Sequence, residues 1–336
     1  MIKRFVALGA MIGLLAVQVL ITQAAGATTP GANGRLAFEL YSEGNDFQGQ
    51  VATMTLEGVG RRVLTPPAPG EPPAPEWSPD GRRIAFVRCS GEESSCNIWT
   101  VRRDGSHERQ VTQCKPEECF GNLGPAWHPD GRHIVFERDQ RNAQGANRPG
   151  LFLIRTDGSG MRRLTSARTF RDISHSEPQY SPDGRWIVFT RVIHESDEPN
   201  RLFIVRADGT NIRPLTPPKL DSDNPDWSPD GHSIVFTGHP RVPGAEFAAN
   251  VYTIHPNGTG IRQLTHGRAD FVFNFFASWS PDGRRIVFDR VVFNRLGESL
   301  VDDVFTMNRR GHARRRVTHT RDRVFEIRPD WGPRVR

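Results

Sequence analysis

The chain alternates short apolar runs with turn-forming residues, and the same arrangement recurs along most of its length. Each copy begins with an aromatic residue. A Ser-Pro-Asp-Gly or His-Pro-Asp-Gly turn follows it, and then comes an apolar run such as Ile-Val-Phe. The copies begin at Trp77, Trp127, Tyr180, Trp227 and Trp279. Proline suits the second position of such a turn, and glycine takes the left-handed position that closes it. The pattern therefore predicts a β-hairpin in every copy.

A third apolar run in each copy leads to an Asp-Gly or Asn-Gly turn, which favours a second hairpin. A short fourth run then ends in Leu-Thr or Val-Thr. The copies begin roughly 50 residues apart, which is close to the length of a propeller blade. Four antiparallel strands per copy predict an all-β protein, a β-propeller.

The first copy lacks its opening strand, and the end of the chain carries the missing piece. Residues 34–38 match the strand that follows the turn in later copies, and residues 329–333 match the Pro-Asp-Trp-Ser-Pro stretch around Trp227. We therefore predict a six-bladed β-propeller of four-stranded antiparallel blades over residues 34–336, closed by the C-terminal strand joining the first blade in a 3+1 clasp. One aromatic residue per copy is expected to pack between neighbouring blades: Trp77, Trp127, Tyr180, Trp227, Trp279 and Trp331.

The turn motif, the Ile-(Ala/Val)-Phe run after it and the Asp-Gly and Leu-Thr signals resemble the repeats of the TolB-type β-propeller family, also called WD40-like PD40 repeats. The resemblance implies six blades and covers the propeller alone, because TolB carries an α/β domain ahead of its propeller and only a short lead precedes residue 34 here. Peptidases of the prolyl oligopeptidase type carry related propellers. The Gly-x-Ser-x-Gly elbow of their hydrolase domain does not occur in this sequence.

Residues 1–27 have the pattern of a secretory signal peptide, in which Lys3 and Arg4 precede an apolar run and small residues mark the cleavage site. Residues 28–33 would form a short disordered lead. We expect an exported protein that is periplasmic, bound to the cell envelope or secreted, with no membrane span after cleavage. An uncleaved anchor helix is the alternative. The formal net charge of +6 is modest and does not indicate a nucleic-acid partner.

The four cysteines are Cys89, Cys96, Cys114 and Cys119, and all of them fall in one repeat. An oxidising compartment favours disulfides, and the simplest pairing joins Cys89 to Cys96 and Cys114 to Cys119, although four cysteines allow three connectivities. Metal binding is the alternative, but the spacing lacks a close Cys-x-x-Cys pair.

Strand direction places the uniform Ser-Pro-Asp-Gly and Asp-Gly turns on one face and the long, variable loops on the other. Because binding residues concentrate on loops that a rigid scaffold holds, the variable face is the predicted binding face. Solvated loop charges and, for the aromatic stretch around Phe273, core packing are the alternatives. The candidate binding residues are Arg171, Asp172, His175, Glu177, Asp223, Asp226, His266, Asp270, Phe273, Arg321, Asp322 and Glu326.

These features predict a non-catalytic, monomeric scaffold that binds a protein or peptide partner and needs no cofactor or metal. One alternative is a carbohydrate-active or metal-dependent enzyme that uses paired acids, such as Asp223 with Asp226 or Asp172 with Glu177. Another is a module that binds an envelope polysaccharide. The histidines that a metal at the channel mouth would use are His175, His239, His266 and His319.

Overall fold

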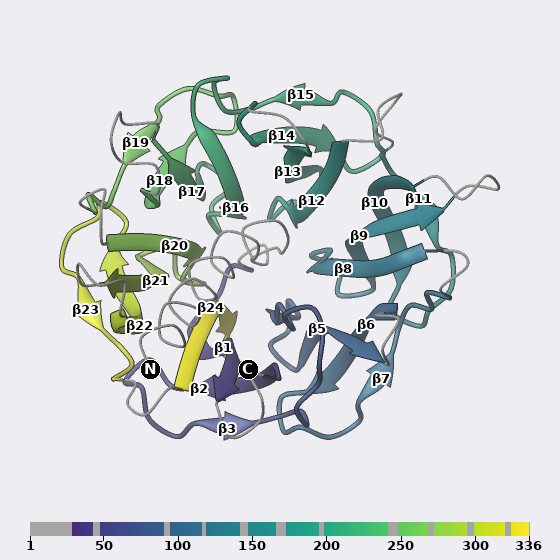
Figure 1. Cartoon of the computed structure of the whole chain (residues 1–336), viewed down its shortest axis with the longest axis horizontal. Coiled ribbons are helices and arrows are strands. Elements are labelled where there is room, and N and C mark those ends of the chain that lie inside the picture. The colour runs from purple at the N-terminus through teal and green to yellow at the C-terminus, as the bar shows by residue number, and fades with distance from the viewer. Residues whose placement is uncertain are drawn as a thin grey trace, which may run out of the picture.

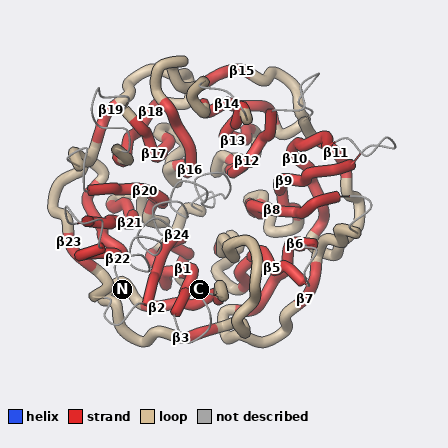
Figure 2. The backbone as a smooth tube through the Cα atoms, in the orientation of Figure 1, coloured by secondary structure: helices blue, strands red, loops and turns tan. Residues whose placement is uncertain are grey.

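The computed structural model describes residues 29–42, 48–90, 95–115, 119–141, 147–165, 173–194, 198–240, 248–267, 272–293, 299–319 and 324–335. The described residues form antiparallel sheets arranged in a ring, viewed along its axis in Figure 1. Figure 2 shows that strands and loops make up the described backbone. No described helix is long and apolar enough to cross a membrane.

Four of the described sheets have four strands each. The first contains β24 (Val324–Pro333), β1 (Asn33–Ser42), β2 (Gln50–Met54) and β3 (Arg62–Val63). The next contains β12 (Ile173–Tyr180), β13 (Trp186–Ile193), β14 (Arg201–Arg206) and β15 (Arg213–Pro214). The other two contain β16 (Asp221–Trp227), β17 (Ile234–His239), β18 (Asn250–Ile254) and β19 (Arg262–Gln263), and β20 (Val272–Trp279), β21 (Arg285–Phe293), β22 (Ser299–Asn308) and β23 (Arg315–Arg316).

The remaining strands form one eight-stranded sheet. It contains β4 (Glu76–Trp77), β5 (Arg83–Ser90), β6 (Ser95–Arg102) and β7 (Arg109–Gln110), followed by β8 (Cys119–Trp127), β9 (His133–Arg141), β10 (Asn147–Arg155) and β11 (Arg162–Arg163). A parallel contact of β6 with β8, in which Cys96 faces Gly121, joins the two groups. The architecture is thus an all-β propeller with four-stranded antiparallel blades, but the sheets do not by themselves give the predicted count of six.

The two ends of the described chain meet in the first sheet. Strand β24 pairs antiparallel with β1, and Leu36 lies opposite Trp331. Figure 1 shows the purple β1 beside the yellow β24. This is the pairing that the match between residues 329–333 and the Trp227 repeat predicts. It covers the edge that β1 would otherwise expose.

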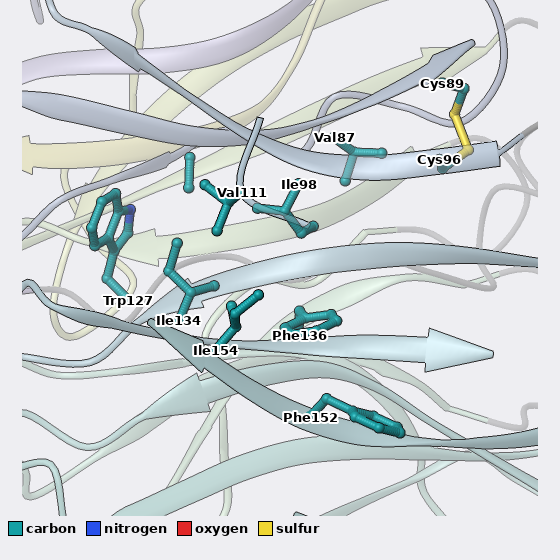
Figure 3. Packing of buried hydrophobic residues seen from close by; sticks show 11 residues of the cluster. Val87, Cys89, Cys96, Ile98, Val111, Trp127, Ile134, Phe136, Phe152 and Ile154 are labelled. Carbon is teal, nitrogen blue, oxygen red and sulfur yellow. A yellow bond between two sulfur atoms is a disulfide. The ribbon is translucent and has the colours of Figure 1, made fainter. Parts of the chain in front are cut away.

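The repeated aromatic residues are buried in the cores between neighbouring groups of four strands. Their exposed fractions do not exceed the 6% of Trp77. Figure 3 shows one such core, in which Trp127 lies beside Ile134 and Val111 and the disulfide of Cys89 and Cys96 lies at the far end. Cys114 and Cys119 form a second disulfide. Both bonds are those of the simplest predicted pairing.

The threonine of the Leu-Thr and Val-Thr pairs has a specific structural role. In every copy its Oγ1 accepts a hydrogen bond of 2.8–3.1 Å from a backbone N–H of the third strand. For example, Thr216 accepts from Leu202. A buried N–H without a partner costs free energy, so the hydroxyl satisfies a group that the two-residue fourth strand does not reach.

Arginines of the second strand lie over aromatic rings of the third strand. The guanidinium carbons of Arg88, Arg138, Arg191 and Arg290 lie 3.8–6.0 Å from the ring centroids of Trp99, Phe152, Phe203 and Phe305. In the sheet of β16–β19, Gly238 occupies the matching position. A Cβ atom there would come within 2.6 Å of the Tyr252 ring. Glycine therefore makes room for tyrosine where the cation–π pair is missing.

Candidate functional site

The innermost strands share a bulge that turns their side chains. In every copy the residue three positions before the repeated aromatic residue has a positive φ: Ala74, Gly124, Glu177, Asn224, Phe276 and Arg328. The pairing register shifts at the same place, for instance between Ser176 and Gln179 and between Asp223 and Asp226. Bulges redirect side chains and often lie beside functional sites.

Buried carboxylates use this geometry to connect neighbouring blades. Some accept the backbone N–H of the next repeated aromatic residue, at 2.7–2.9 Å, in the pairs Asp330 with Trp77, Glu76 with Trp127 and Asp226 with Trp279. Others accept the N–H of the next left-handed residue, also at 2.7–2.9 Å, in the pairs Glu39 with Ala74, Glu177 with Asn224 and Asp289 with Arg328. These acids therefore hold the ring together.

Glu177 replaces a missing acid in this network. Glu39 and Asp289 directly follow the phenylalanine of the second strand, whereas Thr190 occupies that position after Phe189. The Thr190 hydroxyl donates to Glu177 Oε2 at 2.6 Å, and the same oxygen accepts the Asn224 N–H. A carboxylate from the innermost strand thus performs what a carboxylate from the second strand performs elsewhere.

Burial changes the proton affinity of these acids. Burial away from water raises the pKa of Asp330 to about 7. Hydrogen bonds from Trp77, Ser278 and Trp331 lower this pKa, but burial has the larger effect. Burial likewise raises the pKa of Asp302 to about 7, and the nearby Asp303 carboxylate adds to the effect. Desolvation disfavours a charged carboxylate, so both groups titrate near neutral pH.

One pair combines a buried acid with a half-buried imidazole on the loop face. By loop face we mean the face with the blade-to-blade and second-to-third-strand loops. The Nε2 atom of His239 lies 3.0 Å from Oδ2 of Asp223. The exposed fractions of the two side chains are 19% and 2%. Asn224 donates from Nδ2 to the other Asp223 oxygen at 2.7 Å, which fixes the carboxylate.

The charge around His239 is predominantly negative. Burial lowers the pKa of His239, but the Asp223 carboxylate and, behind it, Asp221 and Glu177 outweigh burial and raise that pKa above its usual value. Asp221 begins β16 and lies opposite His239 in the register. This arrangement can hold a positive charge, or it can orient the imidazole for proton transfer.

The structure places the described candidate residues in different environments. His175 is fully buried; its Nδ1 lies 2.8 Å from Thr165 Oγ1, and burial lowers its pKa to about 3. Glu326 is buried and forms a 3.0 Å ion pair with Arg61. His266 is exposed, and Phe273 is half-buried with its ring 5.7 Å from that of Phe293.

The other candidates are not part of a shared described cluster. Arg171, Asp172, Asp270, Arg321 and Asp322 lie outside the described residues. Asp226 accepts the Trp279 N–H of the next blade, and a register shift in β16 lies between it and Asp223. Within the described ranges, the one group of three possible metal ligands is His128, Asp130 and His133, and none of the histidines expected at the channel mouth belongs to it.

Sequence reasoning did not single out Asn224, the blade-connecting acids Glu39, Glu76 and Asp289, or the His128 group. A signal for the last was present, because His128 stands where the other copies of the turn have serine. The acids carried a weaker signal, since the position before the repeated aromatic residue (Glu76) and the position after the phenylalanine of the second strand (Glu39 and Asp289) vary between acidic and neutral residues.

Together, the ring of sheets, its closure and the repeated inner-strand geometry define a β-propeller of the TolB type. The family model for the TolB beta propeller domain, PD40, matches residues 31–242. The chain belongs to this family, which confirms the resemblance seen in its repeats.

The proteins that this chain resembles are named for different functions. The uncharacterized peptidase YuxL of Bacillus subtilis is 28% identical over 166 residues, which is 49% of this chain but 21% of that protein. TolB from Acinetobacter baumannii superposes with a TM-score of 0.66 at 19% identity, covering 90% of this chain and 67% of the other. Oligogalacturonate lyase from Vibrio parahaemolyticus gives a TM-score of 0.56 at 13% identity, covering 88% and 77%. The two structural likenesses show the fold alone.

Proposed function

We propose that this chain is an exported, six-bladed binding propeller that takes a segment of a partner protein on its loop face. The count of six follows if the eight-stranded sheet is divided into the blades β4–β7 and β8–β11. The single residue pair that joins β6 to β8 supports this division, since neighbouring strands inside a blade pair over several residues.

The observation that carries the proposal is the Asp223–His239 pair with its acidic surroundings. It lies at the loop-face end of β16 and β17, where side chains from a rigid sheet meet variable loops. The excess of carboxylates around one imidazole favours a partner segment with a basic side chain or a free amino group.

Export rests on two observations. The N-terminal pattern is that of a signal peptide, and both cysteine pairs are disulfide-bonded. Disulfides persist in oxidising compartments, so we place the protein in the periplasm, at the cell envelope or outside the cell.

Site-specific photocrosslinking in the cell envelope tests the binding face. A photoreactive residue would replace Lys219 or His266, which are exposed on the loop face, and in matched controls Ile212 or Ile261, which are exposed at the opposite, turn-bearing face. We expect the same discrete adduct from both loop-face positions and none from the controls. Adducts of equal yield from all four positions would contradict the assignment of the face.

The purified partner then tests the site. We expect the His239→Ala and Asp223→Asn changes to weaken its affinity at least tenfold, whereas His255→Ala, which removes an exposed histidine of the opposite face, should leave it unchanged. Unchanged affinity in the first two variants would remove the Asp223–His239 pair from the binding site.

The same pair favours a second candidate, an enzyme in which Asp223 orients His239 as a general base. Acidic oligosaccharides and peptides would serve as trial substrates. Turnover that His239→Ala abolishes and His255→Ala retains would replace the binding proposal with this one.

A further inference from the structure

The turn that follows Trp127 differs from its counterparts in chemistry. In the other copies, the serine hydroxyl donates to the turn aspartate at 2.5–2.7 Å and accepts the N–H of the residue five positions later at 2.9 Å. Here His128 replaces the serine. Asp130 Oδ1 accepts the N–H of Arg132, as the turn aspartate does in the other copies, and in addition accepts the N–H of His133. The carboxylate is therefore held without the serine and lies between two imidazoles.

The three side chains converge on one small volume. His128 Nδ1 lies 3.1 Å from Asp130 Oδ1, and His133 Nδ1 lies 2.8 Å from Asp130 Oδ2. The ligand atoms of all three residues lie within 4.8 Å of one another. Bonds of about 2.0–2.2 Å to a tetrahedral zinc ion place neighbouring ligand atoms roughly 3.4 Å apart, so small side-chain adjustments suffice to hold an ion.

The surrounding structure fixes the His128 ring. It packs edge to face against buried Tyr180 of the next blade, with ring centroids 4.8 Å apart. A Cβ atom on Gly184 would lie 2.7 Å from His128 Nε2, so this edge of the ring is in close contact with the neighbouring turn. The other nitrogen, Nδ1, faces Asp130 and lies 3.1 Å from both the backbone nitrogen and Oδ1 of that residue. An ion would take the place of the contact with the backbone nitrogen.

The guanidinium of Arg83, from the neighbouring turn, contacts groups other than the Asp130 carboxylate. Arg83 donates to the Gly131 carbonyl and lies over the Trp127 ring. The three side chains of the group are 28–41% exposed, so solvent or another ligand reaches the remaining coordination positions.

We propose that His128, Asp130 and His133 form a site for a divalent transition-metal ion such as Zn²⁺ on the turn-bearing face, separate from the Asp223–His239 pair. Two imidazoles and one carboxylate form a donor set that suits zinc, cobalt or nickel rather than calcium or magnesium. Three protein ligands leave an open position, which is typical of a site that also binds a further ligand.

Metal titration of the full chain, purified without a histidine tag and stripped with chelator, tests the proposal. Zn²⁺ binding would be measured by calorimetry, and Co²⁺ binding by its visible absorption bands. We expect one Zn²⁺ per chain, with affinity reduced at least tenfold in His128→Ser and in His133→Arg. Both changes introduce the residue that other copies of the turn contain, such as Ser78 and Arg83, so folding should be preserved.

His266→Ser serves as the matched control, since His266 is an exposed histidine outside the group. Its affinity for Zn²⁺ should equal that of the unaltered chain, and Zn²⁺ should raise the melting temperature of both proteins but not of His128→Ser. Absence of stoichiometric binding, or equal binding by all variants, would overturn the proposal.

Discussion

The carboxylate of Asp330 accepts a hydrogen bond of 2.7 Å from the backbone N–H of Trp77, although the two residues are 253 positions apart. The contact connects β24, which closes the first sheet, to β4 of the next. It places an acid with a raised pKa at the junction between the end of the chain and the second copy of the repeat.

The Asp330→Asn change should stabilise the folded protein more at pH 8 than at pH 5. Asparagine keeps an oxygen for the Trp77 N–H but removes the buried charge. Because the folded-state pKa of about 7 exceeds the unfolded value of about 4, the folded state binds the proton more tightly. The stability that Asp330 contributes is therefore present below the unfolded-state pKa and is lost as the pH rises from there through the folded-state pKa.

Urea denaturation at both pH values measures this effect. The variant should gain up to about 4 kcal/mol over the unaltered chain at pH 8, since each pKa unit corresponds to about 1.4 kcal/mol. Asp157→Asn is the control: Asp157 is exposed, and hydrogen bonds from Ser159 lower its pKa, so it should not alter the pH dependence between 5 and 8. A difference between Asp330→Asn and the unaltered chain that stays constant with pH would refute the assignment.

The clasp should make Trp331 indispensable to stability. Its side chain is 1% exposed and packs in the core with Leu36 and Phe38. Trp331→Ala should cost about 3–5 kcal/mol of unfolding free energy, whereas Trp331→Phe should cost clearly less. Deletion of residues 325–336, which removes most of β24, should abolish cooperative unfolding. A truncated chain with an unchanged melting temperature would show that closure does not depend on this strand.

The Leu-Thr pair should matter through its hydroxyl group. Thr216→Val keeps the shape of the side chain but leaves the Leu202 N–H without its acceptor, which should cost about 1–3 kcal/mol. Thr216→Ser retains the hydroxyl and should cost less. Chemical denaturation of the two variants compares their free energies of unfolding. Equal destabilisation would mean that packing, rather than the hydrogen bond, is responsible.

Two glycines of the repeated turn allow the cost of backbone strain to be separated from the cost of a steric contact with a neighbouring side chain. Gly131 and Gly184 have φ values of 66° and 70°, so alanine at either position pays a similar conformational cost of roughly 1–3 kcal/mol. A Cβ atom at Gly131 meets nothing within 4 Å, whereas one at Gly184 meets the His128 ring at 2.7 Å. Gly184→Ala should therefore be the more destabilising change in thermal melts. Equal melting temperatures would show that the His128 ring moves aside without cost.

Local chemistry explains how much of the fold could be predicted. The Ser-Pro-Asp-Gly turns, such as that at Ser78, close through hydrogen bonds among residues a few positions apart, so the sequence contains all the partners. Pairing of β24 with β1 was predictable for a different reason, because a repeated motif was split between the two ends of the chain.

The candidate site was less predictable, because it depends on a bulge in β16 and on contacts of neighbouring acids, such as Asp226 with Trp279, that cross between blades. Asp226 looked like half of an acid pair with Asp223, but the bulge between them sends the Asp226 side chain to the Trp279 N–H and Asp223 to His239. No local pattern reveals a one-residue shift in register.

By itself, the sequence determined the repeating hairpins, the turn residues and the aromatic positions, since each depends on neighbours within one copy or on the repetition of copies. Tertiary structure alone decided which acids connect blades, how Glu177 substitutes for an acid absent at Thr190, and which histidines meet a carboxylate. The physical reason is that a buried carboxylate takes its partners from whatever backbone N–H groups the adjacent blade presents, and those positions exist only after the ring has closed.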